Sequence, residues 1–164
     1  YTWVIEDDEM ADQHSPIYNE NYFAPYEEID QKYAYLFTYH IMDIDESQLT
    51  PELQQIYTTY LTDVFGQTFD IDFDASLSSE ERQEKIAQVL NEAVDGLIAE
   101  IEKRVDATTF EELQTNHEIW LSDQYQYTKE WAHAFGTYDE DQYYRAYKNV
   151  TEDYLANLFY TYLY

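Results

Sequence analysis

The sequence lacks cysteine and is poor in basic residues, glycine and proline. Its 164 residues include no Cys, 3 Gly, 3 Pro and only 8 Lys or Arg. Without cysteine, the chain can form neither a disulfide framework nor a thiolate nucleophile or zinc–thiolate site. With so few basic residues it can neutralise little phosphate, so nucleic-acid binding and binding to anionic membranes are disfavoured.

Acidic residues and tyrosine are abundant instead. The 35 Asp and Glu give a formal net charge of −27, and 19 residues are Tyr. Disordered acidic chains are poor in aromatic residues, whereas 18% of this chain is aromatic, so we expect a folded domain with a partly tyrosine-built core. No apolar run is long enough to span a membrane. Because the chain begins at Tyr1 without Met, we expect an extracytoplasmic protein whose signal peptide has been removed.

The spacing of apolar residues predicts an all-α fold. We expect a single-domain bundle of about five amphipathic helices over 25–164, preceded by an extended N-terminal arm over 1–24. Capping residues mark several helix starts, and glycine marks the ends. The first helix should cover 26–42, the second should run from the Thr50 cap to Gly66, the third should cover 79–105, the fourth should run from a capping box at Thr109 to near Gly136, and the fifth should start at Thr137.

The stretch after Gly66 has a different period. Phe69, Ile71 and Phe73 alternate with aspartates, which predicts an extended segment and at most a small two-stranded β element. The same stretch places carboxylates at positions one, three, five and twelve of a calcium-binding loop, namely at Asp70, Asp72, Asp74 and Glu81.

An alternative interpretation accounts for the same residues without calcium. Ala75 stands where such a loop needs glycine, and Glu81 has the spacing to complete a capping box with Ser78. Calcium is therefore the one cofactor that the sequence suggests, and the helix cap is the competing assignment.

Histidine occurs in two further patterns. Glu130 and His133 have the Glu-x-x-His spacing of di-iron bundles, but no second copy exists, so a histidine near a helix end is favoured. His40 and His117 fall on apolar helix faces and could line an acid–base pocket with Glu118, Asp123 and the tyrosines. No phosphate loop, nucleophile elbow or His-Glu-x-x-His motif occurs, and we predict a protein that is not an enzyme.

Spaced residues in the C-terminal half form a known pattern. Leu90-Asn91 is followed by Leu97, and Leu113 and Trp120 are seven residues apart, with Asp123 and Gly136-Thr137 further on. In these positions, residues 90–158 resemble the bacterial lysozyme-inhibitor family of small secreted helical proteins. His117 stands where that family has glutamine, no Arg precedes Asp123, and the family's paired cysteines are absent. The resemblance implies a lysozyme as the partner.

The charge indicates how such a protein would act. A surface of −27 attracts basic proteins, so we predict an acidic binding protein that engages a cationic protein or peptide. Two alternatives stay open: the acidity could serve solubility in a saline setting, or Tyr-rich surfaces such as 159–164 could assemble homo-oligomers. The carboxylates expected to reach the partner are Asp43, Asp45 and Glu46 in one loop and Asp139, Glu140 and Asp141 in another.

Overall fold

The regular elements of the protein are helices. The computed structural model describes residues 20–39, 42–134 and 140–164, and these residues contain no strand, so the predicted all-α bundle is confirmed. A π-helical turn, η4, joins α3 and α4 into one continuous helix. The elements are α2 (Glu20–Lys32), η2 (Ala34–Leu36), η3 (Glu46–Gln48), α3 (Pro51–Tyr57), η4 (Thr58–Thr62), α4 (Asp63–Asp72), α5 (Ser79–Glu102), α6 (Ala107–Ala132) and α7 (Glu140–Tyr162).

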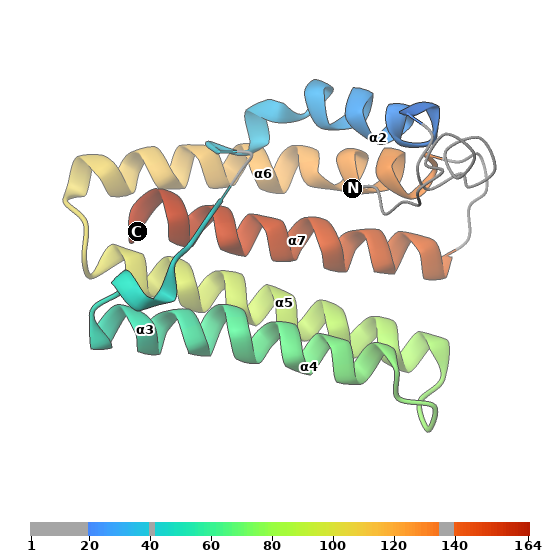
Figure 1. The fold of residues 1–164 in the computed structure, drawn as a ribbon, viewed down its shortest axis with the longest axis horizontal. Helices are drawn as coiled ribbons and strands as arrows, with labels where there is room; N and C mark the ends of the chain where they lie inside the picture. Colours follow the sequence, from blue (N-terminus) through green and yellow to red (C-terminus); the bar gives the residue numbers. More distant parts are fainter. Residues whose placement is uncertain (1–19, 40–41, 135–139) are drawn as a thin grey trace, which may run out of the picture.

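The helices lie side by side with α7 in the middle of the bundle. Helix α2 packs on α6, α6 on α7, α7 on α5, and α5 on α4 (Figure 1). The turn η4 contacts both α5 and α7. Because α7 has neighbours on both sides, it supplies much of the core, including Val150, Tyr154, Leu155, Leu158 and Phe159. No helix of the described residues combines the length and apolar character needed to cross a bilayer.

Aromatic rings fill much of this core. The rings of Trp120 and Tyr154 stack in parallel with centroids 3.9 Å apart, and Tyr57 meets Phe159 edge-on at 5.3 Å. Tyr127 is also buried. Such pairs add about 0.5–1.5 kcal/mol each beyond the burial of their area. The predicted tyrosine-built core is therefore confirmed.

The first predicted helix is wrong at both ends. Helix α2 begins before Pro25 and ends at Lys32, so residues 20–24 of the expected extended arm are helical. After Lys32 the chain forms the 3-10 turn η2. Its capping residue Tyr33 and its last residue Leu36 are both buried. The helical spacing of apolar residues therefore continues beyond Lys32, although the α-helix ends there. Residues 1–19 lie outside the described part of the chain.

The second predicted helix does not stop at Gly66, and the extended segment after it is wrong. Helix α4 runs on to Asp72 because Val64 and Thr68, four residues apart, are both buried on its inner face. Phe69 and Phe73 are likewise four apart, and both are exposed. The alternation of apolar and acidic residues from Phe69 to Asp72 therefore lies on a helix, and Phe73 is its C-terminal capping residue.

Two predicted helix caps are confirmed. The hydroxyl of Ser78 accepts a hydrogen bond of 3.1 Å from the Glu81 amide, and the Glu81 carboxylate accepts one of 3.1 Å from the Ser78 amide. This reciprocal pair is the capping box of α5. The Thr50 hydroxyl accepts from the Leu53 amide at 3.2 Å and caps α3.

The predicted cap of the fourth helix is wrong by three residues. The Asp106 carboxylate accepts a 2.7 Å hydrogen bond from the Thr109 amide, so α6 starts at Ala107. The helix ends at Ala132, with His133 as its capping residue. The predicted boundary residues Gly136 and Thr137 lie outside the described residues.

The segment that crosses from η2 to α3 is held by the C-terminal part of α7. Asn157 is only 4% exposed; its amide nitrogen donates to the Tyr39 carbonyl at 3.1 Å, and its oxygen accepts from the Thr38 amide at 3.4 Å. The Asp45 amide donates to the Tyr164 hydroxyl at 3.2 Å. These bonds explain a buried polar side chain and fix one wall of the cleft described next.

Candidate functional site

A cleft of about 410 Å³ opens between α2, the crossing segment, α6 and α7. Its walls are acidic and aromatic, and none of the described residues that line it is Lys or Arg. In a pocket of this kind, carboxylates and ring faces both favour a positively charged ligand. The lining residues are Glu27, Asp30, Gln31, Ala34, Phe37, Tyr39, Met42, Tyr127, Trp131, Asn149, Val150 and Asp153.

A hydrogen bond across the cleft joins α6 to α2. The hydroxyl of buried Tyr127 donates to a carboxylate oxygen of Asp30 at 3.0 Å. Burial raises the pKa of Tyr127 above its usual value of 10, and the charge of Asp30 adds to the effect. The tyrosine therefore stays protonated and orients the Asp30 carboxylate.

Asp153 is a carboxylate of the cleft that lies in an unfavourable environment for its charge. Its side chain contacts water, yet it is recessed between helices, and this partial loss of hydration raises its pKa to about 6. The charges of Glu152 and Asp30 contribute further. A positive group bound in the cleft would oppose all three effects and favour the ionised carboxylate.

The rings of the cleft are held by other rings. The indole of Trp131 contacts Tyr26 at 4.4 Å between centroids, and Phe37 meets Tyr127 edge-on at 6.0 Å. Tyr33 lies against Tyr127 from the other side at 5.1 Å. These contacts make the aromatic wall a preformed surface.

The predicted partner-binding carboxylates do not form one surface. Asp43, Asp45 and Glu46 lie in the crossing segment, where the Asp45 carboxylate accepts from the Ser47 amide at 3.0 Å and caps η3. Glu140 and Asp141 begin α7, at the opposite end of that 23-residue helix from Tyr164 (Figure 1). Asp139 lies outside the described residues.

The predicted calcium-binding loop is wrong as a loop. Asp70 and Asp72 belong to the last turn of α4, and Glu81 completes the capping box. The Asp74 carboxylate accepts from the Ser76 amide at 2.9 Å. Among the described residues, no three His, Asp or Glu side chains converge as a metal site would require.

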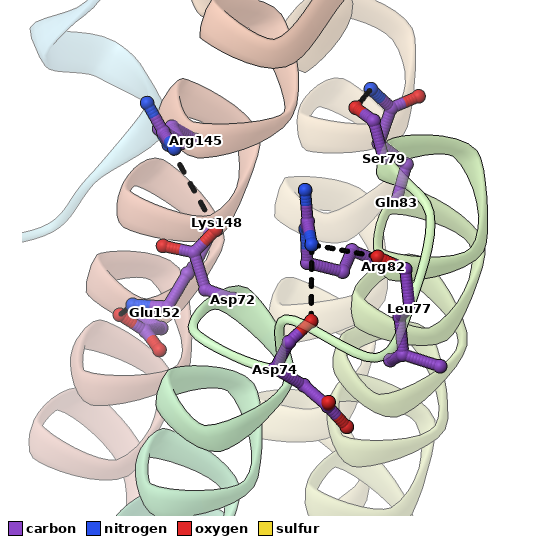
Figure 2. Close-up of polar contacts among 9 residues, drawn as sticks. All are labelled: Asp72, Asp74, Leu77, Ser79, Arg82, Gln83, Arg145, Lys148 and Glu152. Carbon is purple, nitrogen blue, oxygen red and sulfur yellow. Dashed lines mark hydrogen bonds and ion pairs between the residues drawn. The ribbon is translucent and has the colours of Figure 1, made fainter.

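Cations near the same turn make the contacts that Figure 2 shows. Arg82 donates to the carbonyl oxygens of Asp74 and Leu77 at 3.0 and 2.8 Å, closing the connection between α4 and α5. Lys148 donates to Glu152 at 3.1 Å. Arg82 thus links α4 to α5, whereas the Lys148–Glu152 pair lies within α7.

The histidine patterns also resolve into structural roles. His133 is exposed at the C-terminal cap of α6, as favoured, while Glu130 accepts from Lys32 at 2.9 Å. The Nδ1 atom of His117 lies 2.8 Å from the Tyr154 hydroxyl, and burial lowers the pKa of His117.

Asp123 and His117, two members of the expected acid–base pocket, contact different tyrosines. The carboxylate of Asp123 accepts from the Tyr35 hydroxyl at 2.6 Å, so this acid and His117 have separate partners. His40 lies outside the described residues.

Sequence reasoning missed the cleft itself. Asp30, Tyr127, Trp131 and Asp153 come from three distant parts of the chain and were not singled out by any motif. One signal was visible: Asp153 and Asn149 are four residues apart on the polar face of the last helix.

Comparison with known proteins gives no relative. No family model matches the chain, and no match exists among curated proteins or solved structures. Function is therefore argued from the cleft.

Proposed function

We propose that the protein binds a cationic segment of a basic protein or peptide and that the cleft holds one of the partner's basic side chains. The observation that carries this proposal is the cleft's composition: Glu27, Asp30 and Asp153 beside preformed aromatic walls. The net charge of −27 would speed the encounter, because opposite charges steer association. The protein would act by binding, in an extracytoplasmic setting.

The proposal separates a local site from a general field. Any acidic surface attracts a basic peptide weakly, whereas a site loses affinity when its own carboxylates are neutralised. Asp30→Asn with Asp153→Asn changes the net charge from −27 to −25. Glu84→Gln with Glu102→Gln makes the same change at two exposed positions on α5 and is the matched control.

The experiment is calorimetric titration of an arginine-rich dodecapeptide at low salt. We expect the cleft variant to bind about tenfold more weakly, equivalent to about 1.4 kcal/mol, and the control variant to lose less than about twofold. Added salt should weaken binding to the wild type. Equal losses in both variants would contradict the proposal, because they would assign binding to the overall charge.

A lysozyme is a natural second probe, since it is the partner that the family resemblance implies. We expect the wild-type protein to retain a lysozyme on a column at low salt, and the cleft variant to retain less of it than the control variant. If the column retains no lysozyme, a lysozyme is excluded as the partner, and the proposed function then depends on the peptide titration.

Self-assembly is the second candidate function. Phe69 and Phe73 form an exposed ring pair at the C-terminal end of α4, with centroids 4.7 Å apart. The Tyr-rich end gives less support, because Phe159 is fully buried and Tyr160 packs edge-on against Tyr39. Light scattering after chromatography tests this candidate: a monomer at all concentrations contradicts it, and a dimer lost in Phe73→Ser supports it.

A further inference from the structure

We propose that the cleft is one end of a groove along α7 that binds an extended peptide segment bearing a basic side chain and, three or four residues away, a carboxylate. The inference rests on the proposed function, because it assigns the second half of the same site.

The groove arises from two adjoining cavities. Beside the cleft lies a second cavity of about 150 Å³. Trp131 and Asn149 line both cavities, so the two cavities adjoin at these side chains. The described residues that line the second cavity are Tyr26, Trp131, Ala132, Gln142, Arg145, Ala146 and Asn149.

A row of side chains on α7 gives the groove opposite charges at its two ends. Arg145, Asn149 and Asp153 follow one another at intervals of four residues, and all three are exposed. Residues at this spacing lie on one helix face. At 1.5 Å per residue, the eight steps from Arg145 to Asp153 span about 12 Å. Asp30 and Glu27 add negative charge at the Asp153 end.

Arg145 retains the capacity to bind a carboxylate. Its contact with Asp72 is made through Nε at 3.8 Å, and the side chain is 66% exposed (Figure 2). That distance is too long for a hydrogen bond. By contrast, Arg104 contacts Glu52 at 2.6 Å. The Arg145 guanidinium can therefore present its paired N–H groups to a carboxylate, for which their geometry is suited.

The length and polarity of the groove suit a peptide. An extended chain advances about 3.3 Å per residue, so about 12 Å corresponds to three or four residues. Asn149, midway, offers both a donor and an acceptor for a peptide bond. Elsewhere on so acidic a protein a carboxylate is repelled, so Arg145 would select peptides by the spacing of their charges.

The test compares three N-acetylated pentapeptides that begin with arginine and are otherwise uncharged except at the fifth position. One ends in a free carboxylate, the second is amidated, and the third is amidated but carries glutamate at position five. We expect the wild-type protein to bind the first or third peptide about fivefold more tightly than the second. The two carboxylate peptides distinguish a chain terminus from an acidic side chain as the natural ligand.

Variants assign the preference to the groove. The Arg145→Gln variant should bind all three peptides with affinities within about twofold of one another. Its affinity for the second, amidated peptide should equal that of the wild type. Lys103→Gln removes one exposed cation from the end of α5 and should keep the fivefold preference. A preference for the amide in the wild type, or a carboxylate preference that survives Arg145→Gln, would overturn the inference.

The outcomes separate this inference from the proposed function. If Asp153→Asn weakens binding of the amidated peptide but no carboxylate preference exists, only the inference fails. If Asp153→Asn leaves that binding unchanged, or the wild type binds none of the peptides, the proposed function fails as well. Circular dichroism of each variant should show the helix content of the wild type, because the substituted side chains are exposed.

Discussion

The ring of Tyr60 lies against Gly96, so closely that a Cβ atom added at residue 96 would be 2.6 Å from Cε1 of Tyr60. This contact lets the π-helical turn η4 approach α5, which η4 contacts. A glycine in a long helix ordinarily costs about 1 kcal/mol relative to alanine. Here the close approach gives a physical reason for it.

Gly96→Ala should lower the free energy of unfolding by about 1 kcal/mol, because the cost of overpacking exceeds the gain in helix propensity. Gly66→Ala is the matched control: nothing lies within 4 Å of a Cβ at residue 66, so alanine should raise stability by about 0.5–1 kcal/mol. Urea unfolding measures both. Equal shifts in the two variants would show that Tyr60 moves aside freely.

The start of α6 offers a second comparison. Asp106→Ala removes the side chain that accepts from the Thr109 amide and should cost about 1 kcal/mol. Thr109→Ala, at the position that sequence alone suggests as the cap, should change stability by less than about 0.5 kcal/mol. Thermal or urea unfolding of the two variants decides between them, and the reverse order would restore Thr109 as the cap.

Asp153 should make stability depend on pH in a defined direction. Its pKa in the folded protein, about 6, lies above the usual 3.8, so folding retains a proton between about pH 4 and pH 6. Below this window Asp153 costs nothing, and as the pH rises through it the ionised form destabilises the fold. Asp153→Asn should therefore be more stable than the wild type at pH 7 and equally stable near pH 3.

The control for Asp153 is Glu84→Gln, which removes one exposed charge outside the cleft. It reports how much stability comes from lowering the net charge alone. The two variants should differ at pH 7, measured by urea unfolding. An identical gain for Glu84→Gln would assign the effect to general repulsion.

His117 should titrate in the opposite sense. Burial lowers its pKa below 6.5, so the stability that neutral His117 contributes is present above about pH 6.5 and is lost as the pH falls further. Proton NMR of the ring measures the pKa directly, and His117→Gln should flatten this part of the stability profile. A ring that titrates above 6.5 would contradict the effect of burial on the pKa of His117.

Local signals in the sequence predicted the parts of the fold that local interactions determine. The third predicted helix matches α5 closely, because Ser78 and Glu81 cap it and a long apolar stripe follows. The sequence predicted an extended segment around Phe69 because apolar residues alternate with aspartates there. The same alternation also places Phe69 and Phe73 four residues apart, which suits a helix, and the burial of Thr68 favours the helix. At the start of α6, Asp106 and Thr109 are both suitable capping residues only three positions apart, and the structure has Asp106 as the cap.

The cleft could not be predicted from such local signals. Asp30 and Tyr127 are 97 residues apart, and their contact exists because α2 packs on α6. The predicted partner-binding residues around Asp43 and Asp139 rest on acidic residues that are adjacent in the sequence, which is a local signal. The carboxylates of the cleft come from different helices: Glu27 and Asp30 from α2, and Asp153 from α7.

The π-helical turn η4 has a consequence for changes in chain length. A π-helical turn bonds residue i to residue i+5 and so accommodates one residue more than an α-helical turn. Deleting one residue within Thr58–Thr62 would convert it to α-helix with little rotation between α3 and α4. The same deletion inside α5 would rotate everything after it by about 100°. The long helix from Pro51 to Asp72 thus contains one place where the chain can be shortened while both ends keep their partners.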